Sequence, residues 1–156
     1  MQPHFHHTRE RGEKQAVALL VQDTTDLDFT HRQKMEGLGQ IGNQKGRGLF
    51  LQTVLAVVPH TREVLGCAMQ EPFVRTPIPE GETRSQRHQR KERETDVWMR
   101  MVSRLGPFPA EMIVVHVGDR GADLFPFFLE CQANHTAFLV RVFENRRVEP
   151  EVEPQQ

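Results

Sequence analysis

Short apolar segments, separated by polar or glycine-rich stretches, constrain the fold of this chain more than any other feature of its sequence. Each segment is six to ten residues long and rich in aliphatic side chains, which is typical of a buried strand. The segments are residues 16–22, 49–58, 64–70, 112–117 and 137–143. The short connection between the second and the third predicts an antiparallel hairpin.

Two other segments have the pattern of helices. Residues 95–105 carry five apolar side chains at the spacing of one helical face. A second helix is predicted over residues 124–132, with Asp123 as its cap and Pro126 in its first turn. The predicted order, strand–strand–strand–helix–strand–helix–strand, gives an α/β fold with a mixed sheet of about five strands and flanking helices. The apolar residues of the first helix are Val97, Trp98, Met101, Val102 and Leu105.

Three stretches lack a core-forming pattern. Residues 1–15 are polar, and we expect them to be an unordered lead-in. Residues 30–48 contain five glycines, which favours a loop. Residues 145–156 are predicted to be a disordered tail, so the expected folded core covers residues 16–144.

The composition excludes several classes of protein. The 156 residues correspond to one ordinary domain. No apolar run approaches the roughly 20 residues that cross a bilayer, and residues 1–15 lack the apolar core of a signal peptide. Two cysteines cannot form a disulfide framework, so we expect a cytoplasmic protein. Because no run is long enough to cross a bilayer, we expect no membrane partner. The net charge of -1 provides no global positive field that would attract nucleic acid.

Asp23 and Asp119 directly follow two of the predicted strands, residues 16–22 and 112–117. If these strands are parallel neighbours, both carboxylates leave the same edge of the sheet, where the sites of α/β proteins lie. Such a pair suits magnesium or manganese, and two of these ions about 3.5–4 Å apart activate water for attack on a phosphodiester. The alternative is that each aspartate only begins a loop or caps a helix.

Five blocks of the sequence, taken together and in order, are similar to those of a known protein family. They resemble the catalytic core of DDE transposases of the bacterial insertion-sequence-four type, over residues 16–148. The resemblance depends on the QDTT and GDRGAD blocks occurring together at this spacing. The five blocks are VQDTTDLDF (residues 21–29), GLGQIGNQKGRGLFLQTVLAV (37–57), ETDVWMRMVSRLG (94–106), VVHVGDRGADLFPFF (114–128) and FLVRVFENRRV (138–148).

The resemblance implies an RNase H-like fold and an enzyme that cuts and pastes DNA. By position, Asp23 matches the first metal-binding acid of the family and Asp119 the second, in a site that holds two magnesium or manganese ions. A water molecule, and later the freed 3′-hydroxyl, then attacks a phosphodiester.

The third acid of the family is a glutamate on a helix beyond the fifth strand, and this sequence stops before it. We therefore expect a truncated transposase whose fold is incomplete at the C-terminus. The alternative is a non-catalytic remnant that keeps at most DNA or partner binding, and a compact nuclease that recruits another acid is a third option.

Several basic residues are candidate DNA contacts. They lie in the glycine-rich stretch, in a charged run before the first predicted helix, and in and after the fifth predicted strand. The alternatives are a solvated surface for the charged run and, for Arg141, a nearby carboxylate as its partner. The expected partners are DNA and, through an exposed fifth strand, another copy or a full-length transposase. The candidates are Lys45, Arg47, Arg84, Arg87, Arg90, Arg141, Arg146 and Arg147.

Overall fold

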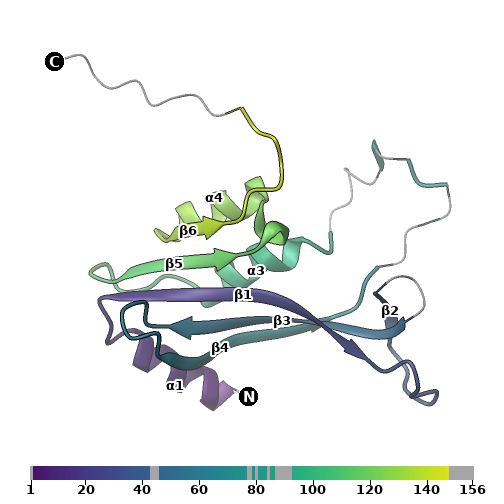
Figure 1. Cartoon of the computed structure of the whole chain (residues 1–156), viewed down its shortest axis with the longest axis horizontal. Coiled ribbons are helices and arrows are strands. Elements are labelled where there is room, and N and C mark those ends of the chain that lie inside the picture. The colour runs from purple at the N-terminus through teal and green to yellow at the C-terminus, as the bar shows by residue number, and fades with distance from the viewer. Residues whose placement is uncertain are drawn as a thin grey trace.

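The computed structural model describes residues 2–42, 46–76, 79, 81–83, 85–86 and 93–147. Its centre is a six-stranded mixed sheet that packs against helices (Figure 1). The predicted α/β class and mixed sheet are confirmed, with one more strand than expected. The strands are β1 (Val17–Asp28), β2 (Gly39–Ile41), β3 (Gly46–Val57), β4 (Val64–Phe73), β5 (Ile113–Gly118) and β6 (Ala137–Val140); the helices are α1 (Gln2–Gly12), α3 (Asp96–Leu105), η1 (Arg120–Ala122) and α4 (Phe125–Ala133).

Strand β1 lies between an antiparallel half and a parallel half of the sheet. On one side it pairs with β3, which pairs antiparallel with both β4 and the short β2. On the other side it pairs in parallel with β5, which pairs in parallel with β6. The predicted antiparallel hairpin is therefore confirmed as β3 and β4.

The first strand is longer than the sequence pattern indicates. We predicted its end at residue 22, whereas β1 continues to Asp28 because its polar second half pairs with β3, from Asp23 opposite Thr53 to Asp28 opposite Gly48. Gly48 permits this pairing, since a Cβ there would lie 2.0 Å from the carbonyl oxygen of Leu27. The prediction of a loop over residues 30–48 is wrong where β2 and the start of β3 occupy it.

The polar N-terminal segment is a helix and not an unordered lead-in. Side chains of α1 contact backbone carbonyls on two other elements: Arg9 donates to Leu105 at 2.5 Å, and Arg11 donates to Leu65 at 2.6 Å. Thr8 is buried against Gly66, where a Cβ would lie 2.5 Å from its hydroxyl oxygen. Polar contacts therefore hold α1 on β4, which explains why a search for apolar periodicity does not find it.

The hydrophobic core lies between the sheet and helices α3 and α4. All five predicted apolar residues of α3 are buried, so this amphipathic helix is confirmed. Phe127 and Cys131 of α4 are also fully buried against them. The same face of the sheet contributes Leu20, Val54 and Val114 to this core.

The opposite face of the sheet carries a row of apolar side chains that none of the described helices covers. Leu55, Val21, Val117 and Leu139 are register neighbours across β3, β1, β5 and β6. Leu139 is 65% exposed, on an edge strand of four residues. An apolar face beside an unpaired strand edge favours self-association.

We expect the purified chain to form larger species as its concentration rises, and we expect Leu139→Lys to reduce this. A lysine at the middle of β6 places a charge on the edge and removes an exposed apolar side chain, two features that oppose edge-to-edge pairing. Size-exclusion chromatography with light scattering measures the effect. Gln132→Lys, an equal charge change on exposed α4 surface, is the control, and a monomer at every concentration contradicts the prediction.

Candidate active site

Asp23 and Asp119 lie just past the parallel pairing between β1 and β5. The last pair in the register is Val21 with Val117, and each aspartate follows two residues later on its own segment. Both line one pocket of about 300 Å³. The predicted parallel pairing of the two strands is confirmed. Asp23 does not end its strand as expected, because it lies within β1 and is paired with Thr53 of β3.

A tight turn after β5 holds the Asp119 carboxylate. Asp119 caps η1, and its Oδ1 accepts a hydrogen bond from the backbone N–H of Gly121 at 2.7 Å. A Cβ on Gly118 would lie 2.5 Å from the Cβ of Ala122, and one on Gly121 would lie 3.0 Å from the Trp98 ring. The glycines of the GDRG block are therefore needed for this turn to pack against α3.

Two further carboxylates, Asp26 and Glu94, line the same pocket. Arg75 engages Glu94 through two hydrogen bonds of 2.7 and 2.9 Å, and its guanidinium lies 4.8 Å from the centre of the Phe50 ring. The hydrogen bonds to Glu94 raise the pKa of Arg75. Within the described ranges, no three His, Cys, Asp or Glu side chains lie together as a metal-binding group. Asp23 and Asp119 therefore stay a predicted pair of metal ligands.

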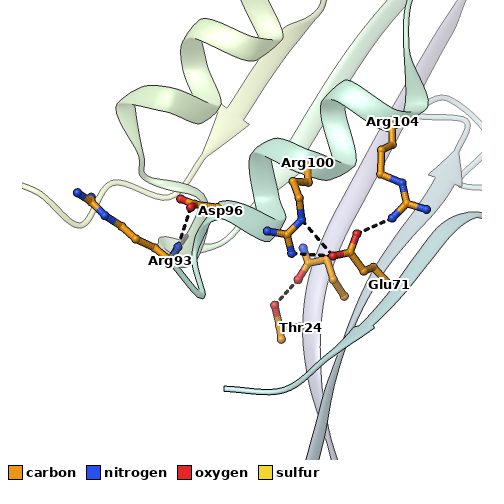
Figure 2. A network of polar contacts seen from close by, with 7 residues as sticks. Thr24, Glu71, Arg93, Asp96, Arg100 and Arg104 are labelled. Atoms are coloured by element: carbon orange, nitrogen blue, oxygen red, sulfur yellow. Dashed lines mark hydrogen bonds and ion pairs between the residues drawn. The ribbon is translucent and has the colours of Figure 1, made fainter. Parts of the chain in front are cut away.

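A buried row of polar side chains runs beside the pocket, and the sequence analysis missed it. The Thr24 hydroxyl donates to Gln52 (Figure 2), Gln52 donates to Gln22 at 3.4 Å, and the Gln22 amide lies 3.2 Å from Nδ1 of His116. The amide N–H donates to that nitrogen, so the neutral ring carries its proton on Nε2. The available signal was the presence of Gln22, Gln52 and His116 within or at the end of apolar segments.

Burial lowers the pKa of His116 to about 4, because the imidazolium loses its hydration. His116 is fully buried, and no described residue hydrogen-bonds its Nε2. The side chain therefore stays neutral at physiological pH, where it completes the polar row without adding a charge to the core.

Asp123 has a different role from the predicted one. Leu124, not Asp123, occupies the N-cap of α4. The buried Asp123 carboxylate accepts hydrogen bonds from the backbone N–H groups of Phe143 and Glu144, both at 2.7 Å, and from the Arg146 guanidinium. The two backbone hydrogen bonds are the main cause of the lowered pKa of Asp123. Asp123 thus fixes the segment that follows β6.

The predicted DNA contacts have different environments. Arg146 is engaged by Asp123 and lies over the Phe128 ring, and Arg47 donates to the backbone carbonyl of Met35. Arg141 was expected inside a strand and buried, but it follows β6 and is exposed. Arg147 is also exposed. The remaining candidates, Lys45, Arg84, Arg87 and Arg90, lie outside the described residues, as do residues 148–156 of the predicted tail.

No protein-family model matches the chain, and no curated protein matches it significantly. Among the described residues, no helix has the length and apolar character needed to cross a membrane.

The neutral state of His116 makes stability depend on pH. Because its folded pKa lies below the ordinary value of 6.5, the unfolded chain binds the proton first as the pH falls. The free energy of unfolding is retained above pH 6.5 and decreases toward pH 4. Between about pH 7.5 and about pH 5, this one group lowers it by about 2 kcal/mol.

Urea unfolding at the two pH values measures this decrease in the wild-type chain and in His116→Gln. We expect the variant to lose less stability on acidification, whereas the exposed-site control His60→Gln behaves like the wild type. An equal pH dependence in His116→Gln and wild type contradicts the prediction.

Proposed function

We propose that this chain carries part of the catalytic core of a cut-and-paste DNA transposase of the DDE type, with Asp23 and Asp119 as ligands of Mg²⁺ or Mn²⁺. The observation that carries the proposal is the register of β1 against β5, which brings two aspartates that are remote in the sequence into one pocket. They belong to QDTT and GDRGAD, the two blocks on which the resemblance depends.

The sheet topology supports an RNase H-like interpretation of the fold. Three antiparallel strands, β1, β3 and β4, come first in the chain, and two parallel strands, β5 and β6, are then added on the free side of β1. Helix α3 precedes β5, and helix α4 connects β5 to β6. This is the strand–strand–strand–helix–strand–helix–strand order that the resemblance implies, with helix α1 before it and β2 as a short additional strand.

The residues present fit a hard divalent cation, because magnesium and manganese prefer one or two carboxylates together with water and phosphate oxygens. Bound ions of this kind activate water and stabilise the leaving oxygen of a phosphodiester. The chain itself positions the two proposed ligands. The Gly121 N–H holds one oxygen of Asp119, and the pairing of Asp23 with Thr53 fixes the backbone of the other ligand.

A non-catalytic remnant that binds DNA is the second candidate, and one observation favours it. Glu94 lines the pocket just before α3, but its carboxylate already forms an ion pair with Arg75. In the described residues, the two aspartates are therefore without a third acid that joins them as a metal-binding group. Such a protein would retain the sheet and its DNA contacts without the chemistry.

Nicking of supercoiled plasmid DNA in Mg²⁺ or Mn²⁺ tests the enzymatic proposal. We expect metal-dependent nicking that falls by about 100-fold or more in Asp23→Asn and in Asp119→Asn, because each change removes a charged metal ligand. Asp28→Asn is the matched control, since it makes the same change on β1 at a residue that does not line the pocket.

The outcomes separate the two candidates. Absence of nicking, together with DNA binding that weakens as the salt concentration rises, supports the remnant. Nicking that survives both substitutions contradicts the assignment of the aspartates, and absence of both nicking and binding overturns both candidates.

A further inference from the structure

A second pocket, which we call the α3 pocket, adjoins the pocket of the two aspartates. It has a volume of about 470 Å³ and lies between the end of β4 and the first turns of α3. The two pockets share Phe73 and Glu94 in their linings. A strand that crosses Asp23 and Asp119 therefore has a neighbouring hollow to enter, of a size that holds small organic groups.

The lining of the α3 pocket combines apolar surface with cations. Val74, which is 45% exposed, and Met99 provide apolar surface, and Arg93 and Arg100 provide positive charge. Proteins bind single-stranded nucleic acid by combining positive charge for the backbone with aromatic side chains on which bases stack, and Phe73 adds an aromatic ring to this lining.

The acidic residues of the lining are already engaged by other groups. Glu94 forms its ion pair with Arg75, and Asp96 accepts a hydrogen bond from the backbone N–H of Arg93 at 2.7 Å. Figure 2 shows this Arg93–Asp96 contact, with the Arg93 side chain pointing away from Arg100. The two guanidiniums therefore point in different directions.

Arg100 is oriented by its own contacts with Glu71, which occupy only part of its guanidinium. Arg100 and Arg104, both on α3, converge on the single carboxylate of Glu71 on β4 (Figure 2). The side chain of Glu71 in this ion triad is 16% exposed. Arg100 uses Nε and Nη2 for Glu71, so its Nη1 is not used in that contact.

We infer that the α3 pocket binds one nucleotide of the DNA strand that passes the two aspartates. Its base packs against Val74 and Met99, and its phosphate contacts Arg100. The inference rests on the proposed function for the identity of the strand. Helix α3 then has a second role besides its structural one, because it determines the path by which DNA leaves the aspartate pocket.

Arg100 and Arg104 offer a matched test of this inference, because each contacts Glu71 but only Arg100 lines the α3 pocket. The probe is a fluorescein-labelled single-stranded oligothymidylate, and fluorescence anisotropy is measured with the full chain in EDTA at several salt concentrations. We expect Arg100→Gln to weaken binding by about tenfold and to reduce the salt slope by about one. Arg104→Gln stays within about twofold of wild type. Val74→Glu, on exposed surface, weakens binding without touching the triad.

Circular dichroism and the thermal midpoint show whether both arginine variants remain folded. Equal weakening by Arg100→Gln and Arg104→Gln overturns the inference, because it assigns the effect to general charge or to the triad. Unchanged binding in Arg100→Gln also overturns it.

The use of EDTA keeps this test separate from that of the proposed function, which depends on metal. If nicking requires Asp23 and Asp119 but DNA binding is unchanged in Arg100→Gln, the inference about the α3 pocket is rejected and the enzymatic proposal is kept. Binding that requires Arg100, with no nicking, rejects the enzymatic proposal and retains the pocket.

Discussion

The parallel pairing of β1 with β5 is the interaction on which the rest of this structure depends. Five residue pairs, from Val17 with Ile113 to Val21 with Val117, join the antiparallel half of the sheet to its parallel half. The pairing also brings Asp23 and Asp119 to the lining of one pocket. Because side chains alternate along a strand, a register shift of one residue would exchange the buried and uncovered faces of β5 and carry Asp119 away from Asp23.

The buried polar row supports this register from within the core. Gln22 on β1 contacts Gln52 on β3 and His116 on β5, so one amide spans the junction between the two halves. Buried polar groups are costly unless they find their partners, and these partners meet only in the observed alignment. A register that moved His116 by one position would leave the Gln22 amide without this partner. The row therefore adds specificity to strands whose apolar residues alone tolerate more than one alignment.

The sequence predicted the parts of the fold that depend on apolar periodicity. The buried face of α3 and the β3–β4 hairpin were found because their side chains follow the periods of a helix and of strands. Helix α1 was missed because arginine-to-carbonyl hydrogen bonds hold it, and such contacts leave no periodic pattern. The extension of β1 to Asp28 was missed for a related reason, since backbone pairing with β3 needs no apolar side chain.

The same distinction applies to the candidate site. Asp23 and Asp119 were predicted from their positions next to apolar strands, and the pairing of those strands brings them together. The role of Asp123 was missed because it depends on how the chain folds back after β6, so that a residue before α4 binds the backbone twenty residues later. The ion triad of Glu71 with Arg100 and Arg104 likewise joins β4 to α3 across a long separation in the sequence. Tertiary geometry alone determines such contacts.

Helix α3 connects the core to both pockets. Its buried side, with Met101 and Val102, packs in the core, while Trp98 lines the aspartate pocket and Met99 and Arg100 line the neighbouring one. The glycine turn that carries Asp119 also packs against the Trp98 ring. A displacement of α3 would therefore alter the Asp119 turn and the adjoining pocket together, and the Glu71 triad opposes such a displacement by fixing the exposed side of the helix to β4. The packing that stabilises the sheet and the arrangement of the two pockets are thus consequences of the same helix position.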